Sequence, residues 1–244
     1  MVLKDVVIPA AGLGTRMFPI TQGKISKLML NLRGKPIIDY AIEEAVNSKL
    51  KEIHVIVHNK QSDLYKHLSE SQFSNNLNFV EQKELNGVTN AILKAEDYIT
   101  GNFFAIIYPD ILFISDTPAI SQLISYHSSI QNNLFGYVNL NPSELKYIST
   151  SNYLITDNIN NLTKVTDIIL TANSKNPKKI KFPFRSVYSK EFFELAKSLN
   201  KKQYSDADVL ASLIKNLNIY CKKLNGKIYD TGNPEGFLKA QNNL

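Results

Sequence analysis

Residues 5–21 read DVVIPAAGLGTRMFPIT. The stretch opens with three consecutive β-branched residues, Val6, Val7 and Ile8, which predicts a short buried strand over Asp5–Pro9. A polar and basic segment with glycines, 10–31, follows the strand without strong periodicity. Loops of that length inside a compact domain are usually functional. The stretch therefore predicts an α/β fold in which the first strand ends in a functional loop.

The rest of the first half alternates strands and helices. Helices are expected at 36–48, 61–69 and 88–99, and strands at 52–57, 78–81 and 103–108. Buried strands separated by helices indicate a mostly parallel sheet with right-handed crossovers. Because ligands bind at the carboxyl ends of such strands, the glycine loop and Asp110, which follows the fourth strand, are expected to share one crevice.

The second half of the chain is less regular. Helices are expected at 118–130, 189–199, 206–217 and 234–241, and strands at 134–140, 153–155, 162–165, 180–187, 218–222 and 227–229. The sequence has no internal repeat, linker or low-complexity tract. We therefore expect one domain over 1–244, a Rossmann-like α/β fold whose central, mostly parallel mixed sheet is flanked by helices.

Composition excludes several classes of protein. The 244 residues are 43% hydrophobic and 20% charged, which argues for a globular chain and against disorder. The single cysteine, Cys221, excludes an internal disulfide and a multi-cysteine metal cluster, and four scattered histidines argue against a zinc enzyme. Because the sequence lacks a signal peptide pattern and a run of 18 apolar residues, we expect a cytoplasmic protein without a membrane span.

The formal net charge is +6. A small excess of positive charge is compatible with an anionic small-molecule ligand or with RNA. It is also compatible with no charged partner. No RNA- or DNA-binding motif accompanies the lysines at 175–181 and 201–202. We therefore interpret these lysines as solvated surface and expect no nucleic-acid partner.

The glycine loop is the strongest chemical signal. Gly12 and Gly14 would let backbone N–H groups approach a phosphate chain, and Arg16 adds fixed positive charge. A bare G-x-G pattern is weak, because a tight turn alone would also account for it. The loop is neither a Walker loop, which needs G-x-x-x-x-G-K-[ST], nor a dinucleotide fingerprint, which needs a third glycine and an immediate helix.

The longer string AAGLGTRMFPIT, 10–21, resembles the signature of the sugar-1-phosphate nucleotidyltransferases, especially the bacterial glucose-1-phosphate uridylyltransferases and thymidylyltransferases. Further segments match that family in order, closely up to about residue 113 and loosely over 180–240. They are SKLML at 26–30, KPIIDY at 35–40, Gln82 with GVTNA at 87–91, YPDIL at 108–112 and YDTGN at 229–233.

The resemblance implies the reaction NTP + sugar-1-phosphate → NDP-sugar + pyrophosphate, with UTP or dTTP as donor, glucose-1-phosphate as default acceptor and Mg²⁺ as cofactor. It divides the domain into a nucleotide-binding part, about 1–113, and an acceptor part, about 114–244. Its site residues map here to Ala11, Gly12, Gly14, Thr15, Gln82 and Gly87 for the nucleotide, Arg16 and Lys27 for catalysis, Gly136 and Lys164 for the acceptor, and Asp110 and Asp230 for the metal.

The chain departs from the family pattern in its acceptor half. One extra residue between Thr21 and Lys27 makes Lys24 a rival for the catalytic lysine, although the S-K-x-M-L context favours Lys27. The family's E-K-P segment reads KVTDI here, 164–168, and its Tyr-Gly pair reads YI, 147–148. Two alternatives therefore stay open: a catalytically impaired nucleotide-binding regulator, and an enzyme with another phosphorylated acceptor such as phosphocholine. A homo-oligomer, common in the family, also stays open.

Structural interpretations compete with some of these roles. Asp110 could cap a turn, and the segment DTGN, 230–233, could cap the helix that begins at Pro234. The aromatic residues of the second half are more typical of a core than of a binding platform, and Cys221 is expected to be inert. These aromatic residues are Phe182, Phe184, Tyr188, Phe192 and Phe193.

Overall fold

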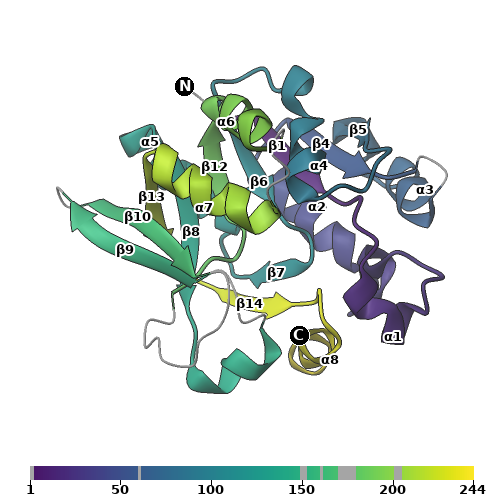
Figure 1. Ribbon diagram of the computed structural model, residues 1–244. Coiled ribbons are helices and arrows are strands. Elements are labelled where there is room, and N and C mark those ends of the chain that lie inside the picture. The colour runs from purple at the N-terminus through teal and green to yellow at the C-terminus, as the bar shows by residue number, and fades with distance from the viewer. Residues whose placement is uncertain (1–2, 60–61, 149–152, 160–161, 170–179, 201–204) are drawn as a thin grey trace.

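The computed structural model describes residues 3–59, 62–148, 153–159, 162–169, 180–200 and 205–244 (Figure 1). The lysines at 175–179 and 201–202 lie outside these ranges. None of the helices in the described part is long and apolar enough to cross a membrane.

The first half forms the four expected strands, which are β1 (Asp5–Pro9), β4 (Glu52–Val57), β5 (Leu77–Glu81) and β6 (Phe103–Ile107). In addition it forms the short strands β2 (Asn31–Leu32), β3 (Lys35–Pro36) and β7 (Ile111–Ile114), which were not expected. Its α-helices are α1 (Phe18–Thr21), α2 (Ile37–Asn47), α3 (Asp63–Ser69) and α4 (Val88–Leu93). The described residues also contain short 3-10 helices. They are η1 (Thr15–Met17), η2 (Lys27–Met29), η3 (Ser74–Asn76), η4 (Glu96–Tyr98) and, in the second half, η5 (Pro142–Tyr147). The helix expected at 88–99 is thus divided into α4 and η4, and the expected loop 10–31 contains η1, α1 and η2.

The second half adds the other strands and helices. They are α5 (Ala119–Ile130), β8 (Asn133–Asn139), β9 (Tyr153–Ile159), β10 (Leu162–Ile169), β11 (Ile180–Lys181), β12 (Arg185–Ser189), α6 (Glu191–Asn200), α7 (Asp206–Asn216), β13 (Ile219–Lys223), β14 (Lys227–Asp230) and α8 (Pro234–Asn243).

Ten strands form one central mixed sheet in the order β11-β9-β10-β13-β8-β12-β6-β1-β4-β5. In Figure 1 the β9–β10 hairpin projects at one end of the sheet, and β5 lies at the other. Strands β6, β1, β4 and β5 are parallel, as expected for the first half. Most pairs of the second half are antiparallel, including those of β12 with β6 and β8. The first half of the chain therefore contributes a parallel part of the sheet, and the antiparallel pairs that make the sheet mixed involve strands of the second half.

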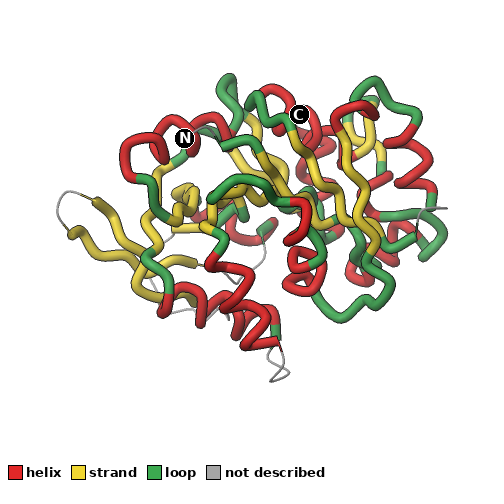
Figure 2. The backbone as a smooth tube through the Cα atoms, turned by 90° about the horizontal axis from the view of Figure 1, so that it is seen from above, coloured by secondary structure: helices red, strands yellow, loops and turns green. Residues whose placement is uncertain are grey.

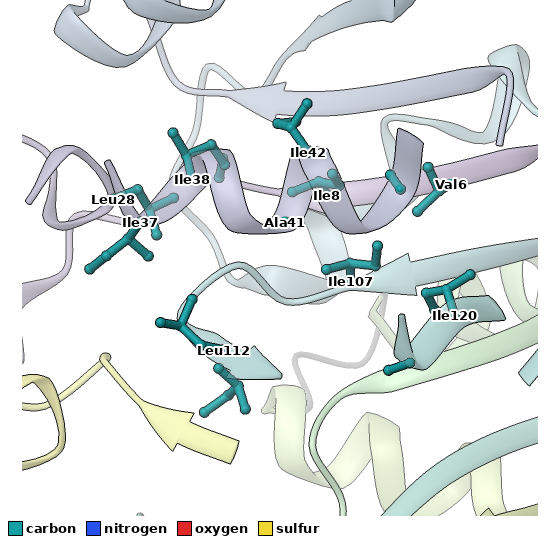
Figure 3. Packing of buried hydrophobic residues seen from close by; sticks show 14 of the residues in the cluster. Val6, Ile8, Leu28, Ile37, Ile38, Ala41, Ile42, Ile107, Leu112 and Ile120 are labelled. Atoms are coloured by element: carbon teal, nitrogen blue, oxygen red, sulfur yellow. The ribbon is translucent and has the colours of Figure 1, made fainter. Parts of the chain in front are cut away.

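Helices cover both faces of the sheet, as the view from above shows (Figure 2). Alternation along each strand divides the core in two: Val6 and Ile8 of β1 belong to one cluster with α2 and α5, and Val7 belongs to the other with α4, α6 and α7. On the first face, Ile38 and Ile42 of α2 pack over the sheet (Figure 3). Burial of both faces explains why the central strands β1 and β6 carry continuous apolar runs rather than an alternating pattern.

Strands β7 and β14 form a separate two-stranded sheet. Of these two strands, β7 was not expected from the sequence. Strand β7 begins directly after Asp110 and pairs antiparallel with β14, which places Asp230 opposite Ile111. The backbone N–H of Thr231 donates to the carbonyl oxygen of Asp110 at 2.9 Å, and its hydroxyl donates to the same oxygen. This pairing brings two aspartates that are far apart in sequence to the same edge of the main sheet.

The single strand expected at 180–187 is broken into β11 and β12. Pro183 lies between them and has no N–H to donate, and Phe184 adopts a φ of 53°. Lys181 on β11 is fully buried, contrary to the expectation that this basic stretch is solvated surface. Its pairing with Val138 of β8 and Tyr153 of β9 incorporates it into the sheet. Cys221 is buried as expected, and burial raises the pKa of its thiol to about 12.

Candidate active site

The glycine loop begins at the carboxyl end of β1, where the N–H of Ala10 donates to the carbonyl of Ile56. Gly14 has a φ of 64°, in the left-handed region that suits glycine. A Cβ at Gly14 would lie 2.8 Å from Cδ of Lys27. Glycine is therefore needed here both for the turn and for the close passage of the Lys27 side chain.

Lys27 reaches the edge of the sheet and contacts Asp110. Its Nζ donates to Oδ2 of Asp110 at 2.5 Å. Burial alone would raise the pKa of the Asp110 carboxyl, but the charges of Lys27 and, beyond it, Arg16 outweigh burial and lower that pKa below its ordinary value. Asp110 is therefore a carboxylate at neutral pH, which a cation ligand requires. Lys24, the rival lysine, is exposed and lines a neighbouring hollow instead.

Gly232 brings the two aspartates together. A Cβ at Gly232 would lie 2.9 Å from Oδ2 of Asp110, 3.2 Å from Oδ1 of Asp230 and 3.3 Å from a terminal nitrogen of Arg16. The N–H of Gly232 also donates to Oδ1 of Asp230. Two carboxylates and a guanidinium therefore converge on one small glycine, where any larger residue would displace them.

Gln82 and Gly87 lie together at the other end of the crevice. Gln82 follows β5, is nearly fully buried, and its side-chain amide donates to the carbonyl of Gly87 at 3.0 Å. Gly87 has a φ of 107° and precedes the first residue of α4. Gln82 and Gly87, which the resemblance assigned to the nucleotide, are thus joined by a hydrogen bond.

Asp206, to which the sequence analysis gave no role, caps this same helix from another part of the chain. Its carboxylate accepts the N–H groups of Val88 at 2.9 Å and Thr89 at 2.8 Å. Both its oxygens lie 2.9 Å from the position of a Cβ at Gly87. Such caps stabilise a helix N-terminus, and here the cap fixes the segment that holds Gln82.

One cavity of about 460 Å³ contains these groups. Its walls include every residue expected for the nucleotide, catalysis and the metal: Ala11, Gly12, Gly14, Thr15, Arg16, Lys27, Gln82, Gly87, Asp110 and Asp230. Leu13, Leu85, Tyr108 and Phe184 also line it and were not expected there. In the described part of the chain, no group of three or more His, Cys, Asp or Glu could hold a metal, so a cation here would rely on the two aspartates.

The two residues expected to meet the acceptor are placed elsewhere. A Cβ at Gly136 would lie 2.4 Å from Cδ1 of Leu224, so this glycine permits close packing of β8 against the chain after β13. Lys164 lies on β10 and donates to Oδ1 of Asn218 at 2.9 Å. Neither is among the described residues that line the cavity. The structure therefore brings the residues assigned to the nucleotide, catalysis and the metal together in one cavity and places Gly136 and Lys164 outside it.

A family model described as nucleotidyl transferase matches residues 5–244. This chain belongs to the nucleotidyl transferase family. A curated relative, the UTP–glucose-1-phosphate uridylyltransferase YngB of Bacillus subtilis, is 28% identical over 99% of this chain and 89% of its own length. The corresponding enzyme of Mycoplasma genitalium is 29% identical over 98% and 90%. A UDP-glucose pyrophosphorylase solved with UDP-glucose superimposes with a TM-score of 0.80 at 26% identity, covering 99% of this chain and 98% of its own. The mixed α/β nucleotidyltransferase fold expected from the sequence is thereby confirmed.

Proposed function

We propose that this nucleotidyltransferase transfers a uridylyl group from UTP to a sugar-1-phosphate, with glucose-1-phosphate as the default acceptor and Mg²⁺ as cofactor. The observation that carries the proposal is the convergence of Lys27, Arg16, Asp110 and Asp230 in the cavity that also contains the glycine loop and Gln82. The names of the relatives support UTP as donor and a glucose phosphate as acceptor.

Some residues of the cavity would bind the nucleotide, and others would stabilise negative charge during the reaction. Gln82 and Gly87 would read the pyrimidine, and the backbone of the glycine loop would hold the phosphates. Arg16 and Lys27 face the site where negative charge accumulates as the acceptor phosphate oxygen attacks the α-phosphorus and pyrophosphate leaves. Phosphoryl and nucleotidyl transfer depend mainly on such positioning and charge neutralisation, so no protein nucleophile is required.

Asp110 and Asp230 would hold the Mg²⁺. Two carboxylates fit this ion, which prefers few protein ligands and takes its other positions from phosphate oxygens and water. When bound, it neutralises phosphate charge and aligns the phosphates. Lys27 donates to Oδ2 of Asp110, so the lysine would help to hold this carboxylate in position.

We extend the proposal to the division of the domain, with about 1–113 binding the nucleotide and about 114–244 the acceptor. Asp230 is the exception. It belongs to the second range in sequence, but the pairing of β7 with β14 brings it opposite Ile111, next to Asp110.

The test is pyrophosphate release with Mg²⁺, crossing the common nucleoside triphosphates with a panel of phosphorylated acceptors. The panel includes sugar-1-phosphates and phosphocholine. Release that needs UTP with a hexose-1-phosphate would support the proposal. Release that needs another pair, for example with phosphocholine, would replace the acceptor. UTP binding by calorimetry without release from any pair would favour a regulatory nucleotide-binding protein.

A further inference from the structure

The order of strands separates the two ends of the cavity. Gln82 follows β5, the glycine loop follows β1 and Asp110 follows β6, in that order across the sheet. The next strand, β12, is antiparallel to β6, so the residues that precede it lie at the same edge. A nucleotide that spans from Gln82 to Asp110 therefore leaves the acceptor on the side of β12. Phe184 is the residue directly before that strand.

A bulge directs Phe184 to this place. Strand β11 pairs Lys181 with Val138 of β8, and β12 pairs Ser186 with Phe135. Four residues thus stand between the paired positions on the β11–β12 side, against two on β8. Bulges of this kind occur next to active sites, where they redirect a side chain. Phe184 is only half-buried and lines the cavity, whereas its chain neighbours Pro183 and Arg185 are buried.

The backbone at Phe184 is strained, and its neighbours hold it there. A φ of 53° is uncommon for a bulky residue, and such outliers cluster at functional sites when the surroundings enforce them. The carbonyl of Phe184 accepts the N–H of Tyr108 at 3.3 Å, and the two rings lie 4.5 Å apart at 34°. Arg185 donates to the carbonyls of Tyr108 at 2.9 Å and Pro183 at 3.2 Å, on both sides of the bulge.

We propose that Phe184, supported by Tyr108, is a specificity-determining residue that packs against the ring of the acceptor sugar. The inference rests on the proposed function and names the acceptor class more closely: a cyclic sugar phosphate with an apolar C–H face. Phe184 is half-buried, lines the cavity together with Asp110 and packs against the rings of Tyr108 and Phe182, so the aromatic surface that it contributes suits a flat, weakly polar partner. It suits a quaternary ammonium less well, because the ring of Phe184 already packs against two neighbouring rings and does not form an open aromatic cage.

This platform explains how the site can bind a sugar when Gly136 and Lys164 are elsewhere. The acceptor phosphate would lie between Lys27, Arg16 and the metal, and the sugar ring would extend from it over Phe184. Binding energy would then come from apolar contact rather than from a second lysine. The enzyme would bind an acceptor less tightly when a bulky or charged group interrupts the apolar face of its ring.

The test compares Phe184→Leu, Phe184→Tyr and the control Phe192→Leu by steady-state kinetics. Phe192 belongs to the aromatic core of the same half, where its ring packs against Phe104 and Tyr188, and it is buried and is not among the described residues that line the nucleotide cavity. Phe184→Leu should raise KM for glucose-1-phosphate about three- to tenfold, the range expected for loss of one ring contact, and leave KM for UTP within about twofold. Phe184→Tyr should keep the wild-type KM for both substrates, and Phe192→Leu should leave both KM values unchanged while lowering Tm.

The outcomes separate this inference from the proposed function. A wild-type enzyme that turns over UTP and glucose-1-phosphate, with the same KM in Phe184→Leu, would overturn the platform alone. Equal rises of KM for both substrates would also overturn it, because they would indicate a general disturbance of the site. A wild-type protein that uses no sugar phosphate, or prefers phosphocholine, would overturn the proposed acceptor and the platform with it.

Discussion

Arg185 and Glu44 form a buried bidentate ion pair between β12 and α2. Two guanidinium nitrogens of Arg185 donate to Oε2 of Glu44 at 2.8 and 3.1 Å, and the side chains are only 2% and 7% exposed. Oε1 of Glu44 also accepts the N–H of Ile120 at the start of α5. The pair therefore ties two helices of one face to the strand that begins after Phe184.

Removing Glu44 should destabilise the fold strongly, because it would leave the Arg185 guanidinium buried without its carboxylate. We expect Glu44→Ala to lower the free energy of unfolding by about 3–5 kcal/mol. The measurement is urea denaturation at neutral pH. The control is Glu43→Ala, one residue earlier on α2, which removes a half-exposed ion pair with Lys35 and should cost about 1 kcal/mol or less. Equal losses in the two variants would show that the buried pair has no special part in stability.

The catalytic lysine can be identified by comparing two lysines three residues apart. Lys27→Ala should reduce kcat by about two orders of magnitude or more, since Lys27 contacts Asp110 and lines the cavity. Lys24→Ala should change kcat by less than about threefold, because Lys24 is exposed beside a different hollow. Both should keep the wild-type Tm within a few degrees. A larger effect in Lys24→Ala would move the catalytic role to that residue.

The metal assignment makes a separate prediction for Asp110 and Asp230. Asp110→Asn and Asp230→Asn each remove one carboxylate charge with little change in shape, so the fold should persist and pyrophosphate release should fall by about two orders of magnitude or more. Circular dichroism checks the fold, and a titration of Mg²⁺ in the rate assay checks the cause. Asp116→Asn is a matched control, because Asp116 is exposed beyond the end of β7. Full activity in either site variant would contradict its role as a metal ligand.

The cavity formed by the glycine loop, Lys27 and Asp110 was predictable because each of these parts belongs to a continuous segment that follows a strand. The glycine loop, Lys27 and Asp110 needed only the correct order of strands and helices to meet. Asp230 was identified by resemblance, but its approach to Asp110 depends on β7, four residues that follow Asp110 without a turn signal. The sequence motifs therefore indicated both aspartates, whereas their proximity depends on the pairing of β7 with β14.

The place of Phe184 in the cavity was not predictable because it depends on strand register. The stretch 180–187, IKFPFRSV, was expected to form one strand, and the bulge at Phe184 exists only through the pairing of its two ends with β8. Lys181 was interpreted as surface because it ends a lysine-rich stretch, and the same pairing buries it. Asp206 could not be assigned a role until α7 was packed beside α4.

Asp206 should influence UTP more than the acceptor. Asp206→Ala removes the carboxylate that accepts the N–H groups of Val88 and Thr89, so the segment that carries Gly87 should lose its fixed position. We expect KM for UTP to rise about fivefold or more with KM for the acceptor nearly unchanged, and stability to fall by about 1–2 kcal/mol. The control is Asp208→Ala on the same helix turn. The carboxylate of Asp208 accepts hydrogen bonds from the N–H and the hydroxyl of Ser205. Asp208→Ala should lower stability by about 1 kcal/mol without changing KM for UTP, and a shift of both KM values in Asp206→Ala would argue against selective positioning.

The burial of Lys181 predicts an unusual dependence of stability on pH. Burial lowers the pKa of Lys181 to about 8 although Asp230 opposes the shift, whereas the ordinary value of 10.5 applies in the unfolded chain. Between these two values the unfolded chain binds more protons than the folded one, so this residue makes stability rise with pH across that window. Lys181→Met should therefore be more stable than wild type at pH 7, by roughly 2–4 kcal/mol, and the gain should shrink as pH rises from 8 to 10. Urea midpoints at several pH values measure the difference, and Lys190→Met, an exposed lysine after β12, serves as the control. A gain that stays constant with pH would show that Lys181 keeps its ordinary pKa in the folded protein.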